Sequence, residues 1–168
     1  MRKLILGAAL AFVLPATAVA APSEPTAADR AAVACKTEKQ LMGTKLFKQT
    51  YGAKSASKAT KACVAKAVPV AEQEAKNAAH ACKAEQDAGR DAFAKKYGTN
   101  ENNKNAFGKC VSGKATEAME DAAEDRADAA QTCKTLKRDD AEAFAKAYGA
   151  RKNAFGRCVS TTARADEA

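Results

Sequence analysis

The apolar residues of the chain form one continuous run near its start and a sparse helical pattern afterwards. Leu4 to Leu14 is an apolar run of 11 residues that follows Arg2 and Lys3. Ala18-Val19-Ala20 then has the small-x-small pattern of a signal-peptidase site, and the run is shorter than the ~20 residues that a membrane span needs. We therefore predict a signal peptide at residues 1–20, cleaved after Ala20. A buried helix or an uncleaved anchor is the alternative.

After residue 20 the apolar residues recur at helical spacing. There is no proline between Asn105 and Arg138, and an apolar stripe along this segment predicts one helix of about 34 residues. The stripe consists of Met119, Ala122, Ala123, Ala129, Ala130, Cys133 and Leu136. Pro69 predicts a kink or a restart in the helix around it. No segment after the signal peptide is apolar over the length of a membrane span, so we expect no transmembrane span in the cleaved chain.

A unit built around two cysteines occurs three times. The copies begin at Cys35-Lys36, Cys82-Lys83 and Cys133-Lys134 and close at Cys63-Val64, Cys110-Val111 and Cys158-Val159. Each copy has a Phe followed four residues later by Tyr-Gly, and the last two share Asn-Ala-Phe-Gly before the closing Cys. The first copy diverges, with Thr60 and Lys61 where the second has Phe107 and Gly108. Such a register indicates an internal repeat, and we name residues 35–63, 82–110 and 133–158 units one, two and three.

The sequence of each unit predicts a first helix, a break, a short helix, a turn and a closing helix, in that order. Breaks are expected at Gly43, Gly89 and Asp140, because Gly tolerates left-handed backbone and Asp caps a following helix. The short helices are expected at 44–51, 90–97 and 141–148, each followed by a glycine: Gly52, Gly98 and Gly149. Their Phe and Tyr are four residues apart and therefore share one helix face. The closing helices are expected to be capped by Ser57, Asn105 and Asn153.

The six cysteines predict disulfides rather than metal or redox chemistry. Their number is even, and the chain is predicted to be exported to an oxidising compartment. Cysteine spacing alone does not select a pairing. Because each unit holds one pair, the repeat favours Cys35–Cys63, Cys82–Cys110 and Cys133–Cys158. Two or more bridges between units are the alternative.

The repeated unit resembles one found in small secreted proteins of high-GC Gram-positive bacteria. The resemblance rests on the pattern CK…F…YG…NAFGKCVS and covers residues 35–160. It implies export and repetition. It implies no particular chemistry, because no activity is assigned to that group.

Together these patterns predict an all-α protein, a short array of three disulfide-stapled helical repeats. The expected division is a divergent first repeat at 21–68, a second at 69–112, and a third with a short tail at 113–168. The second and third share the long helix. The polar tail after Ser160 is expected to fray.

Composition changes the picture by showing how small the cores must be. The chain has 44 alanines and no tryptophan, and beyond residue 20 only 14 residues are Leu, Ile, Val or Phe. So low a number of large apolar side chains is typical of disordered chains. It excludes a large β-sheet core and a conventional α/β enzyme. Alanine favours helix, and the repeat concentrates the few large groups around cysteine pairs.

Candidate catalytic chemistry is sparse. His80 is the one histidine of the chain, so a zinc site or a catalytic triad would need unusual partners. The asparagines between Asn100 and Asn105 lack the acidic and glycine pattern of a calcium loop and favour a turn. We therefore expect no enzyme, no cofactor and no metal site.

Charge gives the remaining prediction. The chain carries a net charge of +8, residues 35–66 hold eight lysines and one glutamate, and residues 117–128 hold six acids and one arginine. A basic first unit can bind a cell-envelope polyanion, an anionic lipid or a nucleic acid. The candidate residues are Lys36, Lys39, Lys45, Lys48, Lys54, Lys58, Lys61 and Lys66. The alternative is that these lysines only solvate an alanine-rich helix. With no arginine-rich reading helix and no base-stacking aromatic set, sequence-specific nucleic-acid recognition is not expected.

Three functional hypotheses follow. The first is a secreted or cell-envelope helical repeat protein with a structural or binding role and no catalysis. The second is a secreted protein that binds polyanions or anionic membranes through residues 35–66. The third is an enzyme of unknown type, which a concave pocket with convergent polar groups would favour.

Overall fold

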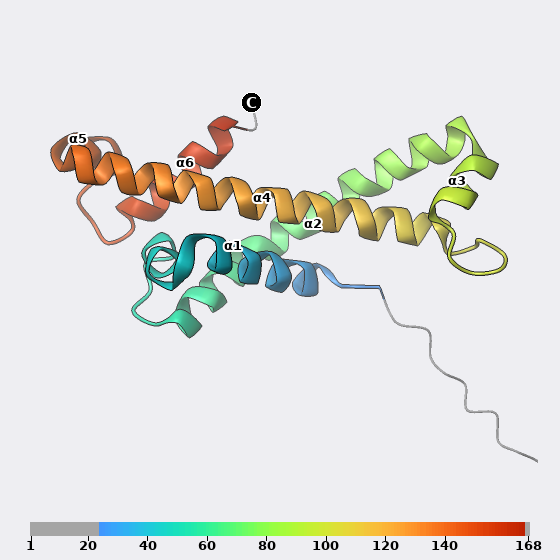
Figure 1. Ribbon diagram of the computed structural model, residues 1–168, viewed down its shortest axis with the longest axis horizontal. Helices are drawn as coiled ribbons and strands as arrows, with labels where there is room; N and C mark the ends of the chain where they lie inside the picture. The colour runs from blue at the N-terminus through green and yellow to red at the C-terminus, as the bar shows by residue number, and fades with distance from the viewer. Residues whose placement is uncertain (1–23, 167–168) are drawn as a thin grey trace, which may run out of the picture.

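The computed structural model describes residues 24–166, and every regular element within that range is a helix. The predicted signal peptide lies outside the described residues. The helices are α1 (Ala27–Thr50), α2 (Ala56–Ala88), α3 (Arg90–Tyr97), α4 (Ala106–Asp139), α5 (Ala141–Tyr148) and α6 (Ala154–Asp166) (Figure 1). The predicted all-α class is thus confirmed.

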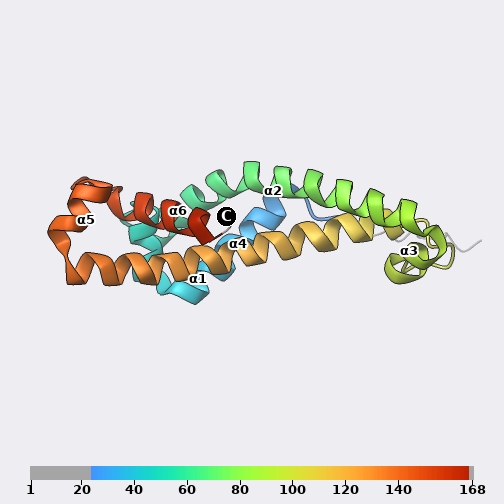
Figure 2. The same cartoon turned by 90° about the horizontal axis from the view of Figure 1, so that it is seen from above.

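The molecule is an elongated helical hairpin with extra helices on one half. The long helices α2 and α4 pack against each other, and α3 lies at the end where the chain turns from one to the other (Figure 2). On the opposite half, α1 packs against both long helices, and α6 packs against α4 and α1. The short helix α5 lies at the far end, where the chain turns from α4 into α6.

All three disulfides have the pairing that the repeat favours. Cys35–Cys63, Cys82–Cys110 and Cys133–Cys158 each join α-carbons 6.0 Å apart. Each bridge ties the first helix of a unit to its closing helix, and all six cysteines are buried. The prediction of one staple per unit is therefore confirmed, and the bridges between units that were the alternative do not occur.

The breaks between the first and second helices of each unit also lie where the sequence places them. Gly43 has a left-handed φ of 77° and bends α1, and Gly89 separates α2 from α3. Asp140 accepts a hydrogen bond from the Ala143 amide at 2.8 Å and so caps α5. The Phe and Tyr rings that follow have centroids 4.9, 4.9 and 5.1 Å apart in units one, two and three. The repeat therefore encodes one local fold three times.

The hydrophobic core is divided unequally among the units. Units one and three share one continuous cluster, which includes Phe47, Met119, Phe144 and Phe155. Unit two has a separate small cluster of four buried residues around its disulfide, with Tyr97, Phe107 and Val111 packed at its edge. Most other buried positions are alanines, whose small side chains let the helices approach closely.

Several local expectations need correction, whereas the predicted long helix is confirmed as α4, with 34 residues. Of the kink or restart predicted at Pro69, the restart does not occur, since α2 continues through the proline. Pro69 and Ala65 are both exposed, so water can satisfy the carbonyl that loses its partner. Ser55, not Ser57, caps α2 by accepting the Lys58 amide hydrogen bond at 3.4 Å.

Two further corrections concern the closing helices of units two and three. The Asn105 side chain does not cap α4, because it bonds to Thr99 across the preceding loop. The tail after Ser160 does not fray within the described residues. Helix α6 continues to Asp166, and Ala163 is buried against the core.

Candidate anion-binding groove

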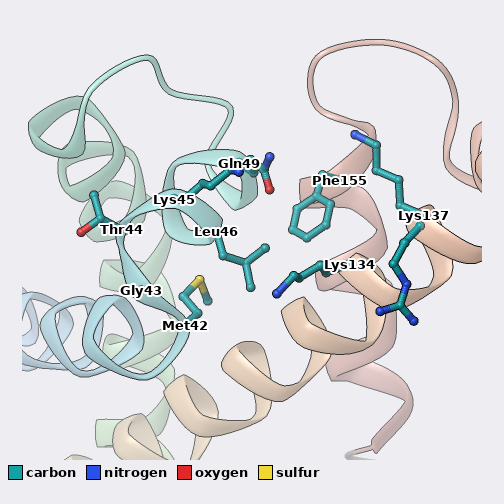
Figure 3. Close-up of a pocket in the computed structure, with 10 residues that line it drawn as sticks. Met42, Gly43, Thr44, Lys45, Leu46, Gln49, Lys134, Lys137 and Phe155 are labelled. Atoms are coloured by element: carbon teal, nitrogen blue, oxygen red, sulfur yellow. The ribbon is translucent and has the colours of Figure 1, made fainter.

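A groove lies where units one and three meet, between the second half of α1, the end of α4 and the start of α6. It has a volume of about 600 Å³. Figure 3 shows Met42 and Leu46 extending from α1 toward Phe155 and Lys134 on the opposite side. We call this hollow the basic groove.

Two glycines position the walls of the basic groove. The left-handed backbone of Gly43 redirects α1, so that Leu46 and Phe47 of its second half turn into the shared core. Gly156 lies directly against the carbonyl oxygen of Thr50, the last residue of α1, and a Cβ there would overlap that oxygen. The start of α6 can therefore approach the end of α1 closely enough to form one wall.

The floor of the groove is apolar. Met42, Leu46 and Phe155 contribute to it, and each is only 5–6% exposed. They are core residues whose outer edges reach the groove. The methylene stems of the surrounding lysines and of Gln49 complete the apolar lining.

The rim of the groove is cationic. Lys45, Lys134, Lys137 and Arg138 line it, and no acidic side chain does so among the described residues. Arg138 forms an ion pair with Asp139 at 2.8 Å, but both side chains are exposed and water weakens the pair. Four cations from two units thus surround one apolar hollow.

A second hollow of about 520 Å³ continues the basic groove around the end of α1. It shares Lys45, Lys137 and Phe155 with the first hollow and adds Lys48, Lys54 and Lys152. Its lining, too, has no acidic side chain in the described part of the chain. We include these three lysines in the rim, which then extends over both hollows.

The structure brings together some of the lysines singled out in the sequence and not others. Lys45, Lys48 and Lys54 line the two hollows. The other five, which do not line them, are Lys36, Lys39, Lys58, Lys61 and Lys66.

The unit-three cations were missed by sequence reasoning, which singled out only the most lysine-rich segment. Lys134, Lys137 and Arg138 lie at helical spacing i, i+3 and i+4, which puts them on one face of α4. That spacing was a detectable signal. What the sequence did not reveal is that this face lies beside unit one.

A network of polar side chains surrounds the buried carboxylate of Glu38 and does not line the groove. Glu38 is 1% exposed, and both its carboxylate oxygens accept the Tyr51 hydroxyl, at 2.8 and 2.9 Å. Arg126 of α4 places its Nε 3.9 Å from the same carboxylate, and Lys66 lies over the Tyr51 ring. Burial raises the pKa of Glu38, and Arg126, Tyr51 and Lys66 oppose the rise. Burial and the adjacent Glu38 also raise the pKa of Tyr51.

Sequence reasoning also missed this network, although the repeat contains a signal for it. Three residues after the first cysteine stand Glu38 in unit one, Glu85 in unit two and Leu136 in unit three. Glu85 accepts the Tyr97 hydroxyl at 2.9 Å, as Glu38 accepts that of Tyr51. Aligning the copies at this position would have predicted the Glu–Tyr pair.

The remaining features are the single histidine, possible metal ligands, possible membrane-spanning helices and the disulfides. His80 is exposed on α2. Among residues 24–166, no group of three or more His, Cys, Asp or Glu side chains is arranged to hold a metal ion. None of the described helices combines the length and the apolar character that a membrane crossing requires. Three disulfides are compatible with an extracellular location.

Comparison with protein families, curated proteins and solved structures finds no match to the chain. The functional interpretation therefore depends on the geometry of the groove. A concave site with a cationic rim and an apolar floor is suited to binding an anion. Among the described residues, its lining holds no His, Cys, Ser, Tyr, Asp or Glu side chain.

Proposed function

We propose that this is an exported, non-catalytic helical repeat protein of the cell envelope that binds anionic ligands at the basic groove. The observation that carries the proposal is the convergence of two units. Three lysines of unit one and three of unit three line two adjoining hollows whose described linings hold no acid: Lys45, Lys48 and Lys54, and Lys134, Lys137 and Lys152. This arrangement goes beyond the solvation of a helix, because the cations come from segments far apart in the sequence.

The fold supports a binding role for this end rather than for unit two. The two units that share the large core also form the groove, so the cations stand on the best-packed half of the molecule. A rigid scaffold holds charges in fixed relative positions and lowers the entropy cost of binding. The acidic stretch at 117–128 lies in the middle of α4, away from the groove-lining residues of its last turns.

The test compares two variants of equal charge. In the groove variant, Lys45, Lys137 and Lys152 are replaced by Gln. In the matched control, the exposed lysines Lys76, Lys95 and Lys104, which do not line the groove, are replaced by Gln. Affinity for fluorescently labelled heparin is measured with the oxidised protein at low and high salt.

We expect binding at low salt that high salt abolishes, because screening weakens exposed charge interactions. The groove variant should lose about tenfold in affinity, given up to about 1 kcal/mol for each exposed ion pair. The control should lose much less. Equal losses in both variants would mean that net charge alone attracts heparin, and no binding at low salt would remove the proposal altogether.

A further inference from the structure

The basic groove differs from a flat basic patch in having an apolar floor. A polyanion needs only exposed cations, which the chain has elsewhere in abundance. Here the cations surround the edges of Met42, Leu46 and Phe155. In Figure 3 the Leu46 side chain is directed across the hollow toward Phe155, and the Lys134 side chain lies beside it. The groove therefore presents an apolar surface and positive charge to the same ligand.

Most of the cations at the groove lack a partner within the protein. Lys45 and Lys134 form no ion pair with any described residue. Lys137 forms none either, and its ammonium lies 6.0 Å from the Phe144 ring centroid, which holds it at the rim. Since these charges are not neutralised locally, an anionic head group would complement them.

The volume of the hollow suits a small molecule. About 600 Å³ falls in the range typical of sites for single small ligands. A polymer or a bilayer would cover the rim without filling the floor. An alkyl chain would lie on the floor between the lysine stems, which are themselves apolar.

We propose that the basic groove binds a single-chain anionic amphiphile. The alkyl chain lies along the floor formed by Met42, Leu46 and Phe155, and the phosphate or carboxylate head contacts Lys134, Lys137 and Lys45. This inference rests on the proposed function, because both use the same cations. It adds a requirement that polyanion binding does not have, namely that the ligand carries an apolar chain.

The first test is a chain-length series. Binding of butyl, hexyl and octyl phosphate, all below their critical micelle concentrations, is measured by calorimetry on the oxidised protein. Inorganic phosphate supplies the head without a chain, and octyl glucoside supplies the chain without a charge. Affinity should rise by about twofold to fourfold per methylene, the upper value corresponding to full burial, and both controls should bind at least tenfold more weakly than octyl phosphate.

The second test locates the ligand with two methionines. The protein is labelled with ¹³C at the methionine methyl groups, and the spectrum is recorded during addition of octyl phosphate. Met42 lines the groove, whereas Met119 is 1% exposed in the same core and does not line it. The Met42 signal, assigned with Met42→Leu, should shift while that of Met119 remains in place.

Each outcome separates this inference from the proposed function. If heparin binds but the alkyl phosphates bind no better than inorganic phosphate, the amphiphile is wrong and anion binding stands. If octyl glucoside binds as well as octyl phosphate, the charged head is not recognised and the inference also fails. Shifts of both methionine signals, or of neither, would likewise overturn it. If neither heparin nor any phosphate binds, both proposals fall.

Discussion

Units one and two have the same local structure, but unit one is packed into the large core and unit two is not. Both close with a disulfide whose α-carbons are 6.0 Å apart, and both place a Phe–Tyr pair at 4.9 Å. In both, a glutamate three residues after the first cysteine accepts the tyrosine hydroxyl. Unit one, however, is covered by α4 and shares the large core, whereas unit two stands at the end of the hairpin with a core of its own.

The two glutamates show what their different surroundings do to the same Glu–Tyr hydrogen bond. The Glu38 side chain is 2% exposed, and that of Glu85 is 32% exposed. Burial raises the pKa of Glu38, while hydrogen bonds from Lys96 and Tyr97 lower the pKa of Glu85. The repeat therefore brings the same Glu and Tyr together in both units, but burial against α4 raises the pKa of Glu38, whereas Lys96 within unit two lowers that of Glu85.

The largest expected effect concerns the disulfides. From loop-closure entropy, each disulfide across a loop of this length stabilises the folded state by about 3.5 kcal/mol. Three together contribute about 10 kcal/mol, which is similar to the net stability of a whole domain. Reduction should therefore cause loss of helix by circular dichroism or a much lower melting temperature. An unchanged melting curve after reduction would contradict the stapled-core account.

Single-bridge variants sharpen the comparison of the two units. Cys82→Ala with Cys110→Ala should speed amide hydrogen exchange in α3 and leave α1 protected, because unit two has its own small core. Cys35→Ala with Cys63→Ala should weaken protection in α1, α2, α4 and α6 together, because that bridge lies in the shared cluster. If both double variants affect the same amides, the two cores unfold as one.

The next effect compares two glycines at the same position of the repeat. Gly156→Ala should destabilise by about 1–3 kcal/mol, because the new Cβ meets the Thr50 backbone carbonyl, which cannot move without shifting α1. At Gly108 the nearest atoms belong to the exposed Glu24 side chain, which can rotate away. Gly108→Ala should therefore be neutral or stabilise by up to about 1 kcal/mol, as helix propensity favours. Urea denaturation measures both, and equal losses would show that α6 does not depend on this close approach.

The local structure was predictable because three copies of one pattern constrain each other. One pair of cysteines is compatible with many folds, but three pairs in register with Phe, Tyr-Gly and a helix break favoured one staple per unit, and the disulfides follow it. Long-range packing had no such constraint. Alanines occur on several faces of α2 and α4, so apolar stripes do not reveal which helix will cover them.

Only one wall of the groove was predictable from the sequence, because the other wall depends on long-range packing that the repeat does not constrain. The lysines of unit one were evident from their density, but their placement beside Lys134 and Lys137 depends on α6 packing against α1. That contact uses Gly156, which follows the same Asn-Ala-Phe sequence as Gly108 and yet has a different partner. In the sequence Arg126 is likewise only the single cation of an acidic stretch, whereas in the structure its Nε lies 3.9 Å from the Glu38 carboxylate.

The smallest expected effect is a pair of opposite pH dependences. The folded-state pKa of Glu38 lies above its ordinary value of 4.5, so its contribution to stability is present below pH 4.5 and is lost as the pH rises through the folded-state pKa. Glu38→Gln keeps an acceptor for Tyr51 but carries no charge. The melting temperature of this variant relative to the wild type should therefore rise as the pH increases above 4.5.

For Glu85 the sign reverses. Its folded-state pKa lies below 4.5, so its contribution is present above pH 4.5 and is lost as the pH falls through the folded-state value. Glu85→Gln should be less stable than the wild type at pH 7 and equal to it in acid, with a small difference because the side chain is partly exposed. Melting temperatures of both variants from pH 3 to 7.5 test the pair. Slopes of the same sign would mean that the cover of α4 over unit one does not control the ionisation of Glu38, and that the two units differ less than their packing implies.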